Sequence, residues 1–251
     1  MVVEAVEDGA VRIIRFNRPE ARNAFNGALY DAVTGALAEA AATDAVHVVV
    51  LTGTGSAFSA GQDLKEMAAI VTGQASPETA QGFRSLLDVV QRFEKPLLAA
   101  VNGVGVGLGF TLLAHCDLVF MADDARLRVP FAELGVPPEA ASSALFARTM
   151  GWQRAAHVLF TGAWVSAEEA VAAGIALARH PAGALLAETV AVARTVAAMP
   201  PEAVMMSKRL LLATRNPEVS AAREREDAGF VELLGSAANL AALERFGGTH
   251  E

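Results

Sequence analysis

Residues 97–114 read LLAAVNGVGVGLGFTLLA and form the only long uncharged run in the sequence. The run approaches the roughly 20 apolar residues that a membrane-spanning helix needs. However, Asn102 and the glycines at 103, 105, 107 and 109 interrupt it, and each glycine weakens a helix by about 1 kcal/mol relative to alanine. Its ends also lack the asymmetry of lysine and arginine that orients a membrane span. We therefore predict no span, but a buried strand at 97–101, a glycine turn at 103–109 and a buried helix at 110–115.

Outward from this run, strand and helix patterns alternate up to about residue 180. Apolar and β-branched runs predict strands, whereas apolar side chains at helical spacing predict helices. The predicted strands are 11–16, 46–52, 116–122 and 126–129, and the predicted helices are 26–42, 83–93, 142–150, 153–160 and 167–173. Asn26 is expected to cap the first helix, and Ser166 with Glu169 predicts a capping box before the last. Residues 53–64 are predicted to form a loop, and the segment 68–82 is polar with no predicted element.

After about residue 180 only helices are predicted, at 184–198, 202–213 and 217–246. Strands that alternate with helices, followed by a helical tail, are typical of an α/β protein. The sequence therefore predicts an α/β core over residues 1–195 and a helical C-terminal region over residues 196–251.

The composition excludes several classes of protein. Hydrophobic residues make up 53% of the chain and charged residues only 19%, so the chain is not disordered. The formal net charge of −8 argues against nucleic acid as a partner, which would require a basic stripe. The single cysteine, Cys116, cannot form an internal disulfide, and the acidic N-terminus does not resemble a secretory signal. We therefore expect a cytoplasmic protein, whose high mean hydropathy of +0.36 reflects burial between subunits or in a ligand cleft.

The sequence offers no pattern for a metal or a nucleotide cofactor. There is no zinc-binding spacing, no P-loop and no G-x-S-x-G motif. The five histidines share no metal-ligand spacing, and we interpret His47 and His115 as structural. The glycines at 103–109 contain a G-x-G pattern, but no acidic residue follows at the distance that a dinucleotide site requires. We expect neither a metal nor a redox cofactor.

Two turns in which a strand leads into a glycine loop suggest a different chemistry. They are VVVLTGTGSAFSAGQDL at 48–64 and PLLAAVNGVGVGLGF at 96–110. Each turn places free backbone N–H groups directly after a buried strand. Two such turns can aim two donors at one carbonyl oxygen, which is the requirement for an oxyanion hole. The alternative interpretation is a pair of ordinary tight turns.

Five stretches of the sequence resemble the crotonase superfamily, the family of enoyl-CoA hydratases and isomerases. The stretches cover nearly the whole chain in order: NRPEARNAFN at 17–26, AFSAGQDLKEM at 57–67, KPLLAAVNGVGVGLGFTLLAHCDLVFMADDARL at 95–127, FAELGVPPEAASS at 131–143 and WVSAEEAVAAGI at 164–175. The resemblance implies a spiral of ββα units with a helical C-terminal region that drives trimers, often paired into hexamers. We therefore expect a homotrimer or a dimer of trimers.

The resemblance also implies a substrate and a set of site residues. Members of the family bind acyl-CoA thioesters, so coenzyme A would enter as part of the substrate. The oxyanion hole would fall on the backbone N–H groups of Gln62 and Leu108. The residues expected to contact CoA or the acyl group are Arg22, Ala24, Ser59, Ala60, Gly61, Gln62, Asp63, Leu64, Gly107, Leu108, Thr111 and Phe131.

Two departures from the family pattern bear on the reaction. Hydratases of this family use two glutamates to add water across a double bond, and these positions are Thr111 and Phe131 here. Without both carboxylates, hydration would lose its general acid and its general base, each worth about 10²- to 10⁴-fold in rate.

One carboxylate remains in a suitable place. Glu139 matches the single catalytic glutamate of Δ3,Δ2-enoyl-CoA isomerases of the peroxisomal type. Its neighbours from Pro137 to Ala141 are apolar, so we expect desolvation to raise its pKa and make it a stronger base. The alternative roles are that Glu139 caps the helix beginning near Ala141, or that Glu133 is the base instead.

The sequence thus predicts a Δ3,Δ2-enoyl-CoA isomerase with Glu139, Gln62 and Leu108 in the catalytic roles. Two alternatives remain: hydration or other thioester chemistry of the same superfamily, and a non-catalytic oligomer that binds acyl-CoA. Asp63 and Asp117 are expected to be hydrogen bonders at a loop and a strand end. Phe246 is a candidate for lining the acyl or CoA cleft.

Overall fold

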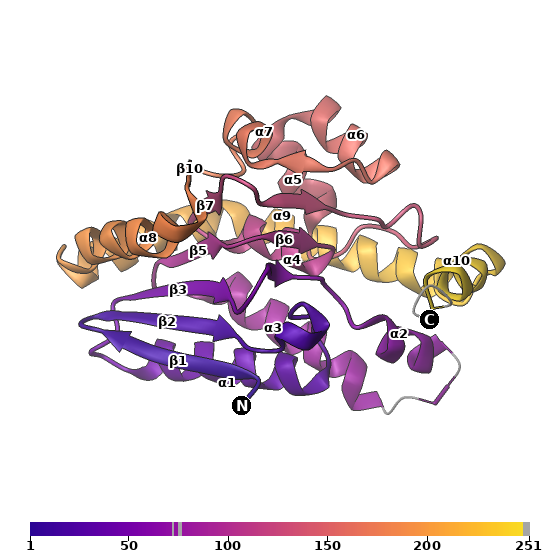
Figure 1. The fold of residues 1–251 in the computed structure, drawn as a ribbon, viewed down its shortest axis with the longest axis horizontal. Helices are drawn as coiled ribbons and strands as arrows, with labels where there is room; N and C mark the ends of the chain where they lie inside the picture. The colour runs from indigo at the N-terminus through magenta and orange to yellow at the C-terminus, as the bar shows by residue number, and fades with distance from the viewer. Residues whose placement is uncertain (72, 75–76, 248–251) are drawn as a thin grey trace.

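The computed structural model describes residues 1–71, 73–74 and 77–247, and it contains two sheets (Figure 1). The larger sheet has six strands in the order β1-β2-β3-β5-β7-β10. They are β1 (Val3–Asp8), β2 (Val11–Phe16), β3 (Val48–Gly53), β5 (Leu97–Val101), β7 (Leu118–Ala122) and β10 (Ala178–His180). Only β1 and β2 pair antiparallel, and the other neighbours are parallel. Strands β3 and β5 are buried throughout, as near-continuous apolar runs in a parallel sheet should be.

The sequence predicted β2, β3, β5 and β7 within two residues at each end, but it missed β1 and β10. β1 reads VEAVED and is mostly exposed, so it offered no apolar run. It is held by a tight hairpin at Gly9, whose φ of 61° lies in the left-handed region. β10 has only three residues, too few for a periodicity to show.

The smaller sheet has four short strands in the order β4-β6-β8-β9. They are β4 (Ala57–Ser59), β6 (Val104–Val106), β8 (Arg126–Arg128) and β9 (Val165–Ser166). β4 and β6 lie inside the two segments that were predicted to be loop and glycine turn, so that part of the prediction was wrong. Their parallel pairing brings the two glycine segments side by side.

Helices surround the sheets. α1 (Gly27–Ala42) packs against α3 (Pro77–Arg92), and α8 (Ala182–Ala197) packs against β3, β5 and β7. The buried apolar side chains of these elements form one main core. The predicted caps are present: the Asn26 side chain accepts from the Leu29 N–H at 3.0 Å, and Ser166 and Glu169 form the capping box of α7 (Ala167–Ala172).

The glycine turn leads directly into a helix, as predicted. Its first part is α4 (Leu108–Thr111), and its second part is the 3₁₀ turn η2 (Leu112–His115). α5 (Ser142–Met150) and α6 (Trp152–Thr161) also agree with the prediction. α2 (Leu64–Val71) and the first turn of α3 occupy much of the polar segment for which no element was predicted.

The C-terminal helices differ from the prediction at two points. α9 runs unbroken from Pro201 to Leu233 with Pro217 inside it, although a break was expected there. Proline removes one helical hydrogen bond, but packing of Val219 and Ala222 against α5 holds the helix together. Conversely, the helix predicted to continue to residue 246 ends at Leu233, because Gly235 has a φ of 78°.

α10 (Ala237–Gly247) follows that break. The side chain of Phe246 lies outside the described residues. The division of the chain at residues 195 and 196 remains a prediction. Within the described part of the chain, no single helix combines the length and apolar character of a bilayer crossing; α8 and α9 meet that test only together, bent by 105°.

A buried ion pair fastens α9 to the larger sheet. The Lys208 ammonium donates to Asp117 Oδ2 at 2.8 Å and to the Lys95 carbonyl at 2.7 Å, and Lys208 is only 4% exposed. Asp117 Oδ2 also accepts from the Leu97 N–H at 2.7 Å, at the start of β5. Asp117 is therefore a strand-end hydrogen bonder, as predicted, and it also serves as the counterion of a helix that arrives much later in the chain.

Asp117→Ala should destabilise the protein by about 3–5 kcal/mol, because it leaves the Lys208 ammonium buried without a counterion. Denaturant unfolding at neutral pH measures the loss. The matched double variant Asp117→Ala with Lys208→Met should recover most of it, since no unpaired charge then remains. Equal stability of Asp117→Ala and the unchanged protein would contradict this role.

Candidate active site

The two glycine segments approach each other more closely than side chains would allow. Gly61 has a φ of 83°, and a Cβ there would lie 2.5 Å from the Val106 carbonyl oxygen and 3.3 Å from the Leu108 nitrogen. A Cβ at Gly109 would lie 2.3 Å from the Ser59 carbonyl oxygen. Such distances are below van der Waals contact, so both positions require glycine. This approach brings the segment containing Gln62 next to the backbone of Leu108.

The N–H groups of Gln62 and Leu108 are both free to meet a substrate. The Phe25 N–H donates to the Gly61 carbonyl at 2.7 Å, and the Asp63 N–H donates to the Phe25 carbonyl at 2.9 Å. This parallel bridge directs the Gln62 N–H away from Phe25. Leu108 is the first residue of α4, so its N–H has no partner inside the helix. Neither N–H has an acceptor among the described residues, which is the condition for a pair of oxyanion donors.

The predicted CoA-binding loop is fixed by hydrogen bonds to residues 22–25. The Ser59 hydroxyl donates to the Asn23 carbonyl at 2.8 Å and accepts from the Gly61 N–H at 3.1 Å. The Ala60 N–H donates to the Arg22 carbonyl at 2.9 Å. Arg22 and Asn23 both adopt left-handed backbone conformations, with φ values of 50° and 56°. Arg22 and the buried Ala24 therefore lie beside the loop, and their contact with CoA stays a prediction.

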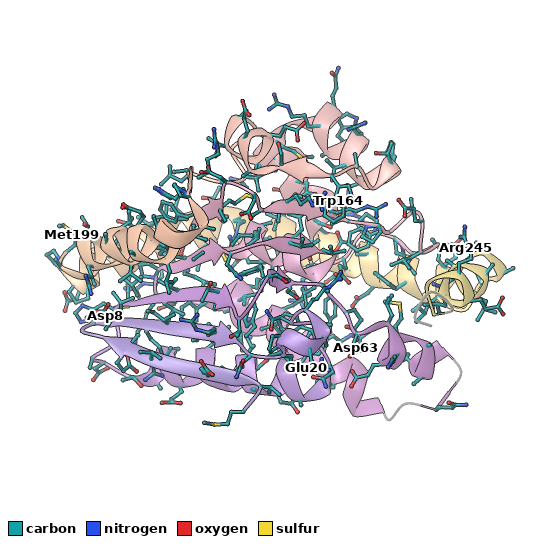
Figure 2. The ribbon with its side chains drawn as sticks, in the orientation of Figure 1. Asp8, Glu20, Asp63, Trp164, Met199 and Arg245 are labelled. Atoms are coloured by element: carbon teal, nitrogen blue, oxygen red, sulfur yellow. The ribbon has the colours of Figure 1, made fainter. Side chains whose placement is uncertain are left out.

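Charges around this loop divide into paired and unpaired groups. Arg18 forms ion pairs with Asp63 at 3.4 Å and with Glu20 at 4.0 Å, and Figure 2 shows both acidic residues on the same flank of the molecule. Asp63 is thus a loop hydrogen bonder, as predicted. In contrast, Arg22 and Lys65 are exposed and form no ion pair in the described part of the chain, and Leu64 beside them is also exposed. These two cations are available to an anionic ligand.

Tyr30 connects the oxyanion loop to the neighbourhood of Glu139, and no sequence pattern predicted this role. It is fully buried between Phe25 and Phe83, and its hydroxyl donates to Gln62 Oε1 at 2.5 Å. Burial raises the Tyr30 pKa well above its ordinary value, and the negative charge of Glu139 raises it further. The phenol therefore stays a neutral donor that orients the Gln62 side chain.

Glu139 is a carboxylate in a desolvated setting. Burial raises its pKa from 4.5 to about 8, and the negative charge of Glu226 adds to the rise. The small cavity beside it is lined by Phe83, Arg84, Leu87, Ala140, Arg223, Glu226, Asp227 and Phe230. A base with a pKa near the working pH combines strength with a usable fraction of the charged form.

The two alternative roles at this end of the site find little support. The N-terminus of α5 is capped by Glu226, which accepts from the Ala141 and Ser143 N–H groups at 2.7 and 2.9 Å, so Glu139 is not its cap. Glu133 forms an ion pair with Arg128, whose Nε also donates to the Gly162 carbonyl at 2.6 Å. Glu133 therefore has a structural partner.

Thr111 and Phe131 are the positions at which the family resemblance predicted the two carboxylates of a hydratase. Thr111 is fully buried, and its hydroxyl has no hydrogen-bond partner among the described side chains. Phe131 is 4% exposed and borders an apolar cavity together with Val136 and Pro138. The described residues also contain no cluster of three or more histidine, cysteine or acidic side chains able to hold a metal.

Comparison with known proteins identifies the family of this chain. The enoyl-CoA hydratase/isomerase family matches residues 7–246. Enoyl-CoA delta isomerase 2 of Rattus norvegicus is 34% identical over 87% of this chain. 2,3-Dehydroadipyl-CoA hydratase of Escherichia coli (strain K12) is also 34% identical, over 86% of this chain and 84% of the hydratase. A solved enoyl-CoA hydratase/isomerase from Pseudoalteromonas atlantica T6c superposes with a TM-score of 0.91 at 33% identity, covering 98% of this chain and 97% of that one.

The chain belongs to the enoyl-CoA hydratase/isomerase family, also known as the crotonase superfamily, and it has the fold of that family. The chain spans 56% of the length of the rat isomerase that it resembles. Isomerases and hydratases are equally similar to it, so the kind of reaction must be argued from the site residues.

The raised pKa of Glu139 should appear as pH-dependent stability. Between about pH 4.5 and pH 8 the folded protein holds a proton on Glu139 that the unfolded chain releases, so this group lowers stability as the pH rises. Glu139→Gln removes this pH-dependent contribution to the free energy of unfolding. The stability of the variant relative to the unchanged protein should therefore rise by roughly 1–3 kcal/mol from about pH 5 to pH 9. Denaturant unfolding at both pH values measures this. The exposed control Glu188→Gln should show no such trend, and a flat difference for Glu139→Gln would contradict the raised pKa.

Proposed function

We propose that this protein is a Δ3,Δ2-enoyl-CoA isomerase. The observation that carries the proposal is one desolvated carboxylate, Glu139, in a site where Thr111 and Phe131 replace the two carboxylates of hydration. Moving a double bond from C3 to C2 needs one base and no added water, whereas hydration needs two acid–base groups.

In the proposed mechanism Glu139 removes a proton from C2 of a 3-enoyl-CoA. The electron pair of that C–H bond moves through the conjugated system, and negative charge develops on the thioester oxygen. The N–H groups of Gln62 and Leu108 would meet this charge without reorganisation. Glu139 then returns the same proton to C4, so the carboxylate is regenerated and no other reactant is consumed. Desolvation favours the first transfer, because it brings the pKa of Glu139 closer to that of the carbon acid.

The binding part of the proposal rests on the exposed cations near the oxyanion loop. CoA carries phosphates, and a chain of net charge −8 repels them at a distance. Arg22 and Lys65 would supply the local attraction, and the segment from Ser59 to Leu64 would line the path of the pantetheine arm. We further propose that CoA enters only as substrate, without metal or redox cofactor, and that the protein is cytoplasmic.

Hydration is the second candidate function, because the Escherichia coli hydratase is as similar to this chain as the rat isomerase is. Hydration here would need water held by groups other than the two missing glutamates. A non-catalytic acyl-CoA-binding oligomer is the third outcome that the assay below distinguishes.

Incubation with a 3-enoyl-CoA should give the conjugated 2-enoyl product, and the ultraviolet absorbance of this product measures the reaction. Glu139→Gln should lower kcat by at least about 10²-fold, since the only base is removed. Glu133→Gln should keep most of the activity. With crotonyl-CoA, loss of the conjugated absorbance would instead indicate hydration, and tight CoA binding without turnover would indicate the non-catalytic alternative. Full activity of Glu139→Gln would exclude it as the base.

The oligomeric state is a separate part of the proposal. α9 exposes large apolar side chains in the single chain, among them Leu210 at 64%, Leu211 at 71% and Val231 at 85%. Exposed apolar area of this kind is typical of a surface that another subunit covers. We expect a homotrimer or a dimer of trimers, and sedimentation equilibrium measures it. A stable monomer at micromolar concentration would contradict this expectation.

A further inference from the structure

The backbone directly after Glu139 is strained. Ala140 and Ala141 both have left-handed conformations, with φ values of 58° and 59°. This region is costly for residues that carry a Cβ, and two such alanines in succession are rarer still. The direction of the Glu139 side chain depends on this turn, because Glu139 enters it and the Ser142 N–H donates back to the Glu139 carbonyl at 3.0 Å.

Two side chains from distant parts of the chain hold the turn. Glu226 on α9 accepts from the Ala141 N–H with Oε2 at 2.7 Å and from the Ser143 N–H with Oε1 at 2.9 Å. His115 Nε2 lies 2.8 Å from the Ala140 carbonyl oxygen. Glu226 is only 6% exposed, so this bidentate contact is shielded from water. Packing of Val219 and Ala222 against Leu145 fixes α9 next to the turn.

We propose that Glu226 is a positioning residue. Its hydrogen bonds hold the strained turn at Ala140 and Ala141, and this turn in turn positions the Glu139 carboxylate for proton transfer. The inference rests on the proposed function of Glu139 as the base. It assigns a role in the site to α9, a helix that begins more than sixty residues after Glu139.

Glu226 also acts on Glu139 through its charge. Most other charged groups that face the turn are neutralised: Arg84 pairs with Asp227 at 3.8 Å, and Arg223 pairs with Asp88 at 2.8 Å. Burial lowers the pKa of His115 to about 4, so this ring is neutral. Tyr30 is a neutral phenol, and Glu66 accepts from the Gly27 N–H at the start of α1. After burial, the Glu226 carboxylate is thus the charge that raises the pKa of Glu139.

Two variants separate the effect of the length of the Glu226 side chain from the effect of its charge. Glu226→Gln keeps the length of the side chain but removes its charge, and one of its two contacts becomes an unfavourable meeting of two N–H donors. It should lower kcat by about 10- to 100-fold, the range expected when a catalytic group shifts by about 1 Å. KM should change little, because no contact with CoA is touched. The midpoint of the rise of kcat/KM with pH reports the pKa of Glu139 in the free enzyme, about 8 in the unchanged protein, and it should move to lower pH.

Glu226→Asp keeps the charge but cannot reach both N–H groups. It should lower kcat by a similar factor while leaving the pH midpoint near its original value. Glu224→Gln is the matched control, since Glu224 lies on the same helix and is exposed. It should leave kcat and the midpoint unchanged.

Relief of strain provides a further test that remains informative if Glu226→Gln folds poorly. In the double variant Glu226→Gln with Ala141→Gly, glycine adopts the left-handed conformation without cost. This variant should recover stability and much of kcat, but its pH midpoint should stay lowered because the charge is still absent.

The isomerase assay separates the two proposals. If the unchanged protein does not isomerise a 3-enoyl-CoA, the proposed function fails, and if Glu139→Gln keeps full activity, Glu139 is not the base. If Glu139→Gln is inactive while Glu226→Gln keeps both the kcat and the pH midpoint of the unchanged protein, only the role of Glu226 is overturned. A fall in thermal stability of Glu226→Gln without either kinetic change would likewise overturn it.

Discussion

The contact between the two glycine segments is the constraint on which the site depends. Gly61 lies against the Val106 carbonyl and the Leu108 nitrogen, and Gly109 lies against the Ser59 carbonyl. Only glycines allow backbone to meet backbone at these distances. The short parallel pairing of β4 with β6 then holds the two segments in register. Because the contact uses backbone atoms alone, two N–H donors are presented by the rigid sheet rather than by mobile side chains.

The carboxylate end of the site is built on a different principle. Glu139 precedes a turn whose two alanines do not favour the left-handed conformation that they adopt. The turn is stabilised by hydrogen bonds from other elements. η2 supplies His115, and α9 supplies Glu226. α9 is itself fastened to the start of β5 through Lys208 and Asp117. The helical tail therefore contributes to the α/β core at two points, one structural and one beside the proposed base.

Sequence patterns lose information where an element is very short or where packing overrides a local preference. Long apolar runs such as 97–101 predicted their strands correctly, because burial on both faces leaves a continuous signal. β4 and β6 were assigned to loops, since each has only three residues. Pro217 predicted a break that does not occur, because packing against α5 compensates for one lost hydrogen bond. The helix ends just before Gly235, but the sequence beside this glycine has no proline and no change in hydrophobic pattern that would have predicted the end.

The sequence by itself determined the family and the glycine turns, and it shows that positions 111 and 131 carry no carboxylate. It also predicted the catalytic roles of Gln62, Leu108 and Glu139. Each of these can be inferred from a local motif, because glycine spacing and residue identity are properties of short stretches. Tertiary structure alone decided that Tyr30 bonds to Gln62, that Glu133 pairs with Arg128, and that Glu226 rather than Glu139 caps α5. Tyr30 and Gln62, and likewise Ala141 and Glu226, lie far apart in the chain. Folding brings the members of each pair into contact, and local periodicity cannot predict a contact between residues that are distant in sequence.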